Sequence, residues 1–434
     1  MNSSLKMNFV FLAALALITA LSTSASAEGR PPNILFILAD DVGQEVLGCY
    51  GGESYQTPHL DALAESGTRF RHCYSMPVCH PSRICLLTGK YPFQLDNPSW
   101  GSFPVSEEKT TLAQVLRGQG YATAISGKWQ IAMLGKDPRH PSRLGFDESC
   151  LFGWHEGPRY FEPMIWQNGK LRDDTAGTYG PDIYVDYLVD FFRRNKERPF
   201  FAFYSMALCH DVTDDLEKPV PHGPNDRYES YAEMVASMDS HVGRIVRSLD
   251  ELSLRKNTLI FFSTDNGTPK SYIARADGNS LVRLPVVSRQ SGKDVPGGKG
   301  DLTDLGTRVP TIASWPGTVP SGRVSDALMD FSDLLPTFAE LAGANPSRPA
   351  LPGQSFADAL RHPREPGRDW VFAERGKNYW FRSRRWKLYS DGRFFDMQAD
   401  PGETTPLPKE GLSRQMAEEK QRLVDAAQAI ITDR

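Results

Sequence analysis

The sequence predicts an α/β protein: a large, mostly parallel sheet sandwiched by helices, followed by a small C-terminal antiparallel β subdomain and a closing helix. Asn33–Ala39 is a continuous apolar run, typical of a strand buried on both faces. Similar apolar segments then alternate with helical patterns, which indicates strands joined by crossover helices. Beyond a Pro/Gly-rich stretch at 343–353, short aromatic segments with a hairpin signal replace this alternation.

The individual elements follow from these patterns. Buried strands are expected at 33–39, 121–126, 200–205 and 258–263. Helices are expected at 59–67, 111–119, 184–194 and 228–252. Polar residues follow each apolar run, and ligands of parallel sheets bind just beyond the carboxyl ends of the strands. We therefore expect these polar residues to converge on one edge of the sheet.

The C-terminal part is expected to be a small subdomain packed on the large one. Strands are expected at 370–373, 379–383, 386–389 and 393–397, and an amphipathic helix is expected at 412–431. Asp391-Gly392 is a two-residue hairpin signal between the last two strands. The predicted domains are therefore a large domain over 28–345 and an antiparallel-sheet subdomain over 346–434.

Residues 1–27 have the pattern of a secretory signal peptide. Lys6 precedes an apolar run at 9–21, and Ala25-Ser26-Ala27 supplies a small-x-small cleavage site. The run is shorter than the roughly 20 residues that span a bilayer, and an uncleaved anchor is the alternative. No later segment is apolar enough to form a stable membrane span. We expect an exported protein, periplasmic or secreted, whose mature chain begins near Glu28.

The composition excludes other classes of protein. The chain has 434 residues, 40% of them hydrophobic, and a formal net charge of −4. No basic run stands out, so no nucleic-acid partner is expected. Six cysteines are too few for a disulfide scaffold in a chain of this length. The sequence leaves open whether Cys73 and Cys85 pair.

Two pairs of oxygen-bearing residues indicate a metal site. Asp40-Asp41 follows the first buried run, and Asp265-Asn266 follows the run at 258–263. Oxygen ligands without histidine or cysteine suit calcium or magnesium rather than zinc. Either pair alone could equally cap a helix or form a turn, but two such pairs at strand ends favour a metal.

The most specific motif is VCHPSR at 78–83, followed by LLTG at 86–89. It resembles the signature of the formylglycine-dependent sulfatases of the alkaline phosphatase superfamily, Cys-x-Pro-Ser-Arg with a following Leu-Thr-Gly. The resemblance implies that a formylglycine-generating or anaerobic sulfatase-maturating enzyme oxidises Cys79 to formylglycine, also known as 3-oxoalanine. It also implies one Ca²⁺ per chain, with these ligands: Asp40, Asp41, Cys79 in its modified form, Asp265 and Asn266.

Further motifs extend the resemblance over nearly the whole mature chain and make 28–345 the sulfatase catalytic domain. Lys128, within Gly-Lys-Trp, and Lys299, within Gly-Gly-Lys-Gly, match the family's two substrate lysines. His210 stands where the family has its substrate histidine. Taken alone, a lysine is usually a solvated charge and a histidine is often a core residue, so these assignments depend on the resemblance.

The resemblance implies hydrolysis in two stages. A hydroxyl of the hydrated aldehyde, acidified by calcium, attacks sulfur, and the second hydroxyl then expels sulfate. Lys128, Lys299 and calcium neutralise the sulfate oxygens, and Arg83 holds the hydrated aldehyde. His210 is expected to protonate the leaving group, with Lys299 as the second candidate.

Gln130 departs from the family, which usually has histidine after Lys-Trp. Glutamine donates and accepts hydrogen bonds but does not titrate. Gln130 is therefore expected to bind substrate, and the base of the second stage is left open.

The expected function is release of inorganic sulfate, with a sulfated saccharide as substrate. Export and the aromatic stretch at 154–166 favour a sugar, although these aromatic residues could equally belong to the core. The alternatives are a phosphoester or phosphonate hydrolase of the same superfamily, and a catalytically silent glycan-binding homologue. The sugar, the sulfated position, endo or exo action and the oligomeric state are left open.

Overall fold

The structure is a computed structural model that describes residues 30–153, 155–211, 228–278, 280–344, 351–363 and 367–431. The predicted signal peptide over 1–27 lies outside these residues. No helix within the described ranges is long and apolar enough to cross a membrane. Residues 31–434 fall in one compact unit, and the boundary expected between 345 and 346 stays a prediction.

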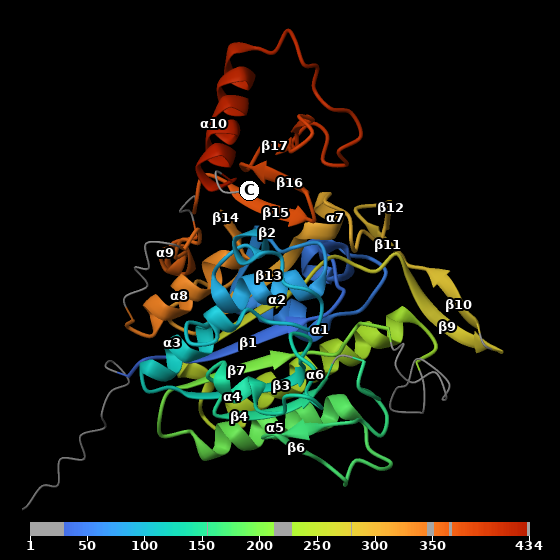
Figure 1. Ribbon diagram of the computed structural model, residues 1–434, viewed down its shortest axis with the longest axis vertical. Coiled ribbons are helices and arrows are strands. Elements are labelled where there is room, and N and C mark those ends of the chain that lie inside the picture. Colours follow the sequence, from blue (N-terminus) through green and yellow to red (C-terminus); the bar gives the residue numbers. More distant parts are fainter. Residues whose placement is uncertain are drawn as a thin grey trace, which may run out of the picture. The chain divides into compact units, whose positions relative to one another are not determined.

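Within the described ranges, ten strands form the central sheet (Figure 1). They are β1 (Asn33–Ala39), β2 (Thr68–Tyr74), β3 (Ala122–Lys128), β4 (Glu148–Phe152), β5 (Trp166–Gln167), β6 (Lys170–Leu171), β7 (Phe200–Ser205), β8 (Thr258–Thr264), β13 (Arg308–Ser314) and β14 (Arg323–Asp330). Their order across the sheet is β14-β2-β13-β8-β1-β7-β3-β4-β5-β6. Strands β8, β1, β7, β3 and β4 are parallel, whereas β13 is antiparallel to both neighbours. The predicted mostly parallel sheet is confirmed.

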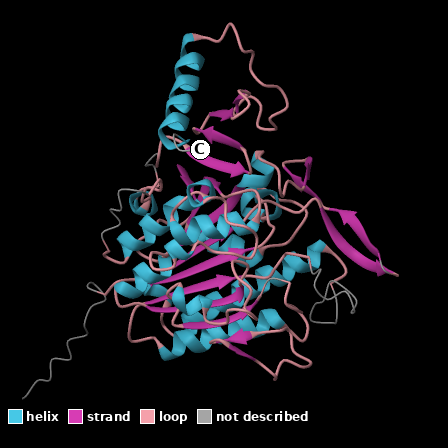
Figure 2. Cartoon of the chain, in the orientation of Figure 1, coloured by secondary structure: helices cyan, strands magenta, loops and turns pink. Residues whose placement is uncertain are grey.

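Helices pack against both faces of this sheet (Figure 2). The helices of the described ranges are α1 (Pro58–Glu65), α2 (Cys79–Thr88), α3 (Leu112–Gly118), α4 (His140–Arg143), α5 (Gly180–Arg194), α6 (Tyr231–Glu251), α7 (Asp304–Thr307), α8 (Leu334–Leu341), α9 (Ala357–Arg361) and α10 (Arg414–Ile431), of which α10 packs on the small C-terminal sheet instead. Short 3-10 helices occupy Gln44–Val46, Gly48–Tyr50, Pro92–Leu95, Val105–Glu107, Arg255–Asn257 and Phe331–Asp333. Helices α1, α5 and α6 contribute to one hydrophobic core, and α2, α3 and α8 contribute to the other.

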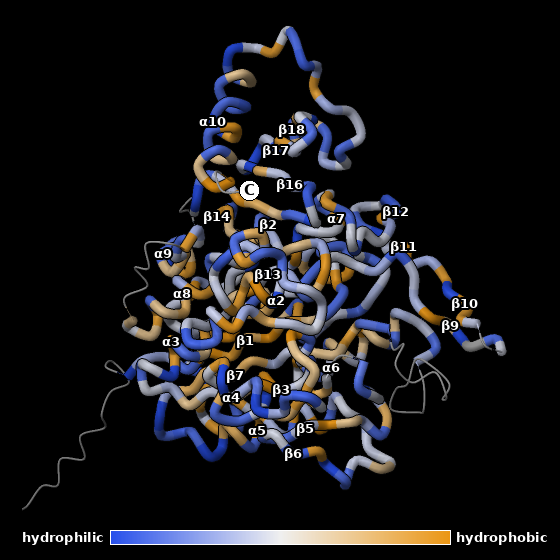
Figure 3. Tube along the Cα trace, in the orientation of Figure 1, coloured by the Kyte–Doolittle hydropathy of each residue, from blue (hydrophilic) through white to orange (hydrophobic). Residues whose placement is uncertain are grey.

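Strand β1 shows why an unbroken apolar run lies at the centre of the sheet. All seven of its residues are buried. Ile34, Phe36 and Leu38 belong to one core and Leu35 and Ile37 to the other, because side chains alternate along a strand. The central strands accordingly carry hydrophobic colouring in Figure 3.

The C-terminal subdomain has the predicted antiparallel sheet and closing helix. Its strands are β15 (Val371–Arg375), β16 (Asn378–Arg382), β17 (Trp386–Tyr389) and β18 (Phe394–Asp396), paired in that order. The turn between the last two strands has three residues, 390–392, rather than the two that were expected, because the Tyr389 N–H donates to Arg393 O at 2.9 Å. Gly392 has a φ of 87°, as the left-handed last position of such a loop requires. Val371, Phe372 and Trp380 join the core that contains α2 and α8, so the small sheet packs on the large domain.

Several strands were not expected from the sequence. Strand β2 alternates arginines and histidine with apolar residues, and β13 contains Pro310, so neither resembles a buried parallel strand. Two hairpins outside the main sheet were also missed: β9 (Ser271–Asp277) with β10 (Ser280–Pro285), and β11 (Val287–Gln290) with β12 (Lys293–Pro296). Strands β10 and β12 are mostly exposed, so they lack the apolar periodicity that predicts a strand.

Candidate functional site

The polar residues predicted to converge do lie at one edge of the sheet. The pair 40–41 follows β1, the pair 265–266 follows β8, Lys128 ends β3, and His210 comes shortly after β7. Strands β8, β1, β7 and β3 are neighbours in that order. Their shared carboxyl edge is therefore the place where the fold assembles a site.

The candidate metal centre consists of Asp40, Asp265 and Cys79. One ligand atom from each residue lies within 4.8 Å of the other two, and all three side chains are buried. Asn266 Nδ2 donates to Asp41 Oδ1 at 2.7 Å, and the Asp41 N–H donates to Asp265 Oδ1 at 3.3 Å. The structure thus brings together the five residues expected as ligands, with three of them in the tightest group.

The donor atoms of this centre fit a hard divalent cation. Asp40 Oδ1 and Asn266 Oδ1 are buried and accept no hydrogen bond from any described residue. Burial raises the pKa of Asp41 and of Asp265, and the neighbouring carboxylates raise both further. A cation would relieve this repulsion, and carboxylate and amide oxygens are the ligands that calcium prefers.

Backbone contacts fix the loop that carries the first two carboxylates. The Asp40 N–H donates to Leu208 O at 2.8 Å, and the Cys209 N–H donates to Asp40 O at 2.6 Å. The Tyr231 hydroxyl of α6 donates to Asp41 O at 2.7 Å. Asp41 has a φ of 61°, a left-handed conformation that costs about 1–3 kcal/mol and clusters at functional sites.

Cys79 is the first residue of α2 and is 1% exposed. The Ser82 hydroxyl donates to Asp265 O at 2.6 Å, and Arg83 Nη2 lies 2.8 Å from Asp265 Oδ2. Arg83 Nη1 also donates to Ser205 Oγ at 2.5 Å. The motif helix is therefore hydrogen-bonded to Asp265 of the candidate metal centre. Burial raises the pKa of the Cys79 thiol, which makes the unmodified side chain a weak nucleophile.

Lys128 and Lys299 each donate to a carboxylate of this centre. Lys128 Nζ donates to Asp40 Oδ2, and Lys299 Nζ donates to Asp41 Oδ2 at 2.6 Å. Gly127 precedes Lys128 because a Cβ at that position would lie 2.0 Å from Ser205 O. The absence of a side chain there lets β3 approach β7 and places Lys128 at the strand end.

The loop that follows Lys299 is held by the C-terminal sheet. Arg375 Nη1 donates to Gly300 O, and Lys387 Nζ donates to Leu302 O at 3.1 Å. The small subdomain therefore positions the loop that carries this lysine, a role that the sequence did not indicate.

His210 presents one ring nitrogen to the site. Its Nδ1 lies 2.5 Å from Asp211 O, and because a carbonyl can only accept, Nδ1 carries the hydrogen. Its Nε2 lies 3.9 Å from Asp41 Oδ2. Burial lowers the pKa of His210, and Lys299 and Lys128 lower it further, so the ring is neutral before substrate binds.

A cavity of about 100 Å³, which we call the Cys79 cavity, opens onto these residues. Its lining includes every predicted substrate contact: Cys79, Lys128, Gln130, His210 and Lys299. Gln130 is 8% exposed, and its Oε1 accepts no hydrogen bond from any described residue. Gln130 Oε1 is therefore available to a hydrogen-bond donor of a ligand.

Five other lining residues were not singled out from the sequence: Trp100, Phe152, Gly153, His155 and Arg159. In the aromatic stretch at 154–166, the Tyr160 ring lies in the core rather than at the cavity. His155 of this stretch does line the cavity, and Trp100, which is 53% exposed, adds an aromatic ring from a separate loop. A tryptophan in a Pro/Ser/Gly loop was the one signal that could have identified it.

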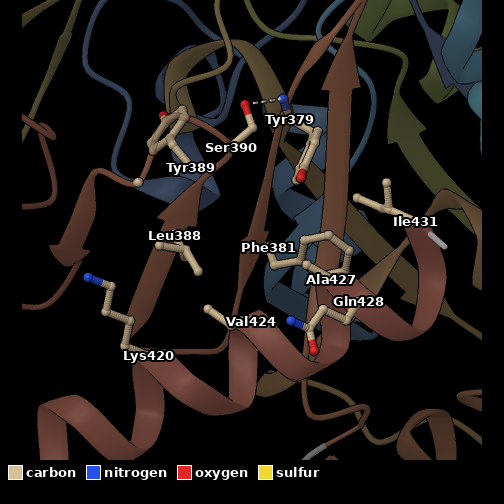
Figure 4. A pocket seen from close by; sticks show the side chains of 11 residues that line it. Tyr379, Phe381, Leu388, Tyr389, Ser390, Lys420, Val424, Ala427, Gln428 and Ile431 are labelled. Atoms are coloured by element: carbon tan, nitrogen blue, oxygen red, sulfur yellow. Dashed lines mark hydrogen bonds between the residues drawn. The ribbon is translucent and has the colours of Figure 1, made fainter. Parts of the chain in front are cut away.

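A larger cavity of about 470 Å³ lies between α10 and strands β16 and β17 (Figure 4). Phe381, Leu388 and Val424 face it. The described residues that line it include no histidine, cysteine or carboxylate. The described lining of this cavity thus lacks metal-ligating side chains, so the Cys79 cavity, which has them, is the candidate active site.

The cysteines and the sequon agree with this assignment. All six cysteines are free thiols, and Cys73 and Cys85 form no disulfide. Asn266 and Thr268 of the Asn-Gly-Thr sequon have no exposed surface, so Asn266 cannot accept a glycan in the folded protein.

The fold and the cluster define an α/β protein with an oxygen-rich candidate metal centre at the carboxyl edge of its sheet. The Sulfatase family model matches residues 32–344. N-acetylgalactosamine-6-sulfatase of Canis lupus familiaris is 31% identical over 80% of this chain and 69% of its own length. The chain belongs to the sulfatase family.

Other relatives agree with this assignment. Steryl-sulfatase of Mus musculus is 31% identical over 76% of this chain, which spans 64% of that relative's length. Among solved structures, Ps i-CgsB matches with a TM-score of 0.73 and 27% identity, covering 92% of each chain.

Proposed function

We propose that this chain hydrolyses sulfate esters of carbohydrates, with formylglycine made from Cys79 as the reactive group. The observation that carries the proposal is the position of Cys79, which lies in one buried cluster with Asp40 and Asp265. The motif expected to be oxidised and the carboxylates expected to hold calcium thus share one small cavity. Two lysines line that cavity, and fixed cations of this kind stabilise charge that develops on an anion.

The residues of the chain take separate roles in this proposal. Lys128 and Lys299 bind the sulfate oxygens, and Arg83, fixed between Ser205 and Asp265, holds residue 79 in place. When bound by Asp40, Asp41, Asp265 and Asn266, Ca²⁺ supplies positive charge that acidifies a hydroxyl of the hydrated aldehyde.

The leaving oxygen of a sugar is a poor leaving group and needs a proton. His210 can supply it from Nε2, because the negative charge of a bound sulfate ester favours the protonated ring. Gln130 binds a sugar hydroxyl, which donates to its Oε1, or a sulfate oxygen, which accepts from its Nε2–H.

The names of the relatives support a sulfated sugar as substrate. The solved relative Ps i-CgsB has been determined in complex with k-i-k-neocarrahexaose, and the canine relative is an N-acetylgalactosamine-6-sulfatase. We also propose export through the signal peptide at 1–27 and maturation by a formylglycine-generating or anaerobic sulfatase-maturating enzyme.

The test is an assay for free sulfate with protein that was co-expressed with a formylglycine-generating enzyme. The substrates are 4-methylumbelliferyl sulfate, N-acetylgalactosamine 6-sulfate and carrageenan oligosaccharides. 4-Methylumbelliferyl phosphate is assayed separately, for release of phosphate. We expect sulfate release that Cys79→Ala abolishes without unfolding the protein, and an aldehyde at residue 79 in peptide mass maps. Active protein with only a thiol at residue 79, or phosphate release without sulfate release, would refute the proposal.

A further inference from the structure

Trp100 forms a shared wall between two cavities. It lines the Cys79 cavity and also a second cavity of about 320 Å³. Trp100 is 53% exposed, so a ligand that reaches from one cavity to the other can contact it.

The second cavity has about three times the volume of the Cys79 cavity. Ligand cavities in proteins typically measure roughly 300–1,000 Å³. The Cys79 cavity, at about 100 Å³, can enclose a sulfate group and only part of a sugar ring. The second cavity, at about 320 Å³, reaches the usual range for a bound ligand.

The position of Trp100 is fixed from the catalytic motif. The ring stacks on His80, with 5.6 Å between centroids and 28° between planes. His80 Nε2 lies 2.9 Å from Ser102 O, and the Ser102 N–H donates to Ser99 O at 3.0 Å. Because His80 directly follows Cys79, the ring is held at a constant distance from the reacting residue.

The walls of the second cavity come from three parts of the chain. Val78, Pro81 and Ile84 belong to the VCHPSR motif and α2, Asn97 and Ser99 belong to the loop that carries Trp100, and Glu374, Arg375 and Gly376 belong to the end of β15 and its turn. The side chains of Asn97, Ser99 and Arg375 offer hydrogen-bond donors and acceptors beside an aromatic face, and the first part adds apolar surface. That combination suits a sugar ring, which has hydroxyls at its rim and an apolar face of C–H groups.

We propose that the second cavity is a subsite for the sugar next to the sulfated one, and that Trp100 stacks on the saccharide chain between the two cavities. The substrate is then an oligosaccharide, bound jointly by the large domain and the C-terminal sheet. This inference depends on the proposed sulfatase function and narrows its substrate class.

The test compares kcat/KM on matched pairs of substrates. One pair is N-acetylgalactosamine 6-sulfate and a chondroitin 6-sulfate tetrasaccharide, and the other is galactose 4-sulfate and a neocarrageenan tetrasaccharide. We expect the wild type to prefer at least one tetrasaccharide over its monosaccharide by tenfold or more. Trp100→Ala should remove most of this preference, and Trp100→Phe should keep more of it.

Gly376→Asn places a side chain beside the second cavity without straining the fold. Gly376 has a φ of 60° and nothing within 4 Å of an added Cβ, and asparagine tolerates this conformation. In the Gly376→Asn variant, we expect the ratio of kcat/KM on the tetrasaccharide to kcat/KM on the monosaccharide to fall at least fivefold. Gly278→Asn is the matched control, because Gly278 has a φ of 59° and equally open surroundings in the β9–β10 hairpin. The control should behave like the wild type.

The outcomes separate this inference from the proposed function. Equal kcat/KM on both members of each pair, or an unchanged preference in Gly376→Asn, overturns the second subsite. Hydrolysis of 4-methylumbelliferyl sulfate with no turnover of any saccharide also overturns it but leaves sulfate-ester hydrolysis standing. No turnover of any sulfate ester by protein with the aldehyde in place overturns both.

Discussion

Lys387→Met tests how firmly the C-terminal sheet holds the loop behind Lys299. The Lys387 side chain is fully buried, with Nζ 3.2 Å from Asp304 Oδ1 and 2.9 Å from Glu403 Oε1. Methionine keeps the apolar stem but removes the charge and the hydrogen-bond donors. The substitution therefore leaves two buried carboxylates with one cation fewer.

The expected loss of unfolding free energy follows from the remaining contacts. Removing one partner of a buried ion pair costs about 3–5 kcal/mol, because an uncompensated charge stays behind. Asp304 keeps its ion pair with Arg382, and Glu403 keeps its hydrogen bond from the Tyr389 hydroxyl. These contacts favour the lower end of the range, about 3 kcal/mol.

Urea denaturation of the mature protein, followed by fluorescence, measures this loss. Lys387→Met with Glu403→Gln should be less destabilised than the sum of the two single variants, since the second change neutralises the stranded carboxylate. Lys409→Met, at an exposed lysine of the same subdomain, is the control and should change the midpoint little. A loss of unfolding free energy below about 1 kcal/mol in Lys387→Met would refute this reasoning. Losses in the two single variants that simply added in the double variant would also refute it, because the Lys387–Glu403 pair would then not hold the loop.

Three further predictions concern the candidate site. Asp265→Ala removes a buried carboxylate ligand and should abolish both calcium binding, measured by metal analysis, and activity; full activity after exhaustive chelation contradicts this. His210→Ala should reduce kcat/KM on a sugar sulfate far more than on 4-methylumbelliferyl sulfate, whose leaving group needs little protonation, and equal losses would assign His210 to sulfate binding alone. Gln130→Ala should slow turnover about tenfold, the scale of one lost hydrogen bond at ~0.5–1.5 kcal/mol, without changing the shape of the pH–rate profile. Unchanged kinetics, or sulfated enzyme detected by mass spectrometry, would contradict that role.

The sequence predicted the parts of the molecule whose signals are local. Strand β1 and the strands beside it are uninterrupted apolar runs, and polar residues at their ends had to meet once the strands were parallel. Lys299 carries no such local signal and was identified only through a family motif, whereas Lys128 follows an apolar run but received its substrate role from the resemblance alone. The structure brings both into contact with the carboxylates at 40–41.

The parts that the sequence missed depend on contacts between distant segments. Nothing in the loop around Trp100 indicates that it meets the turn after β15, because neither segment has a periodic pattern. Strand β13 contains a proline and is antiparallel in a largely parallel sheet, so its place depends on pairing with β8 and β2 rather than on its own residues. Arg159 lies in a stretch whose aromatic residues dominated the pattern, yet its charged side chain lines the cavity together with His155 of the same stretch.

The charges of the candidate metal centre bear on which ester it can accept. Three ion pairs leave the carboxylates without net charge: Lys128 with Asp40, Lys299 with Asp41, and Arg83 with Asp265. A divalent cation held there would give the cluster two net positive charges. Arg159 and His210 also line the Cys79 cavity, and a protonated His210 would add to this charge. An anionic ester that enters the cavity would offset it, since buried charges need compensation. The charges therefore favour an anionic ester over an uncharged one, and the comparison of 4-methylumbelliferyl sulfate with the phosphate distinguishes the two anions.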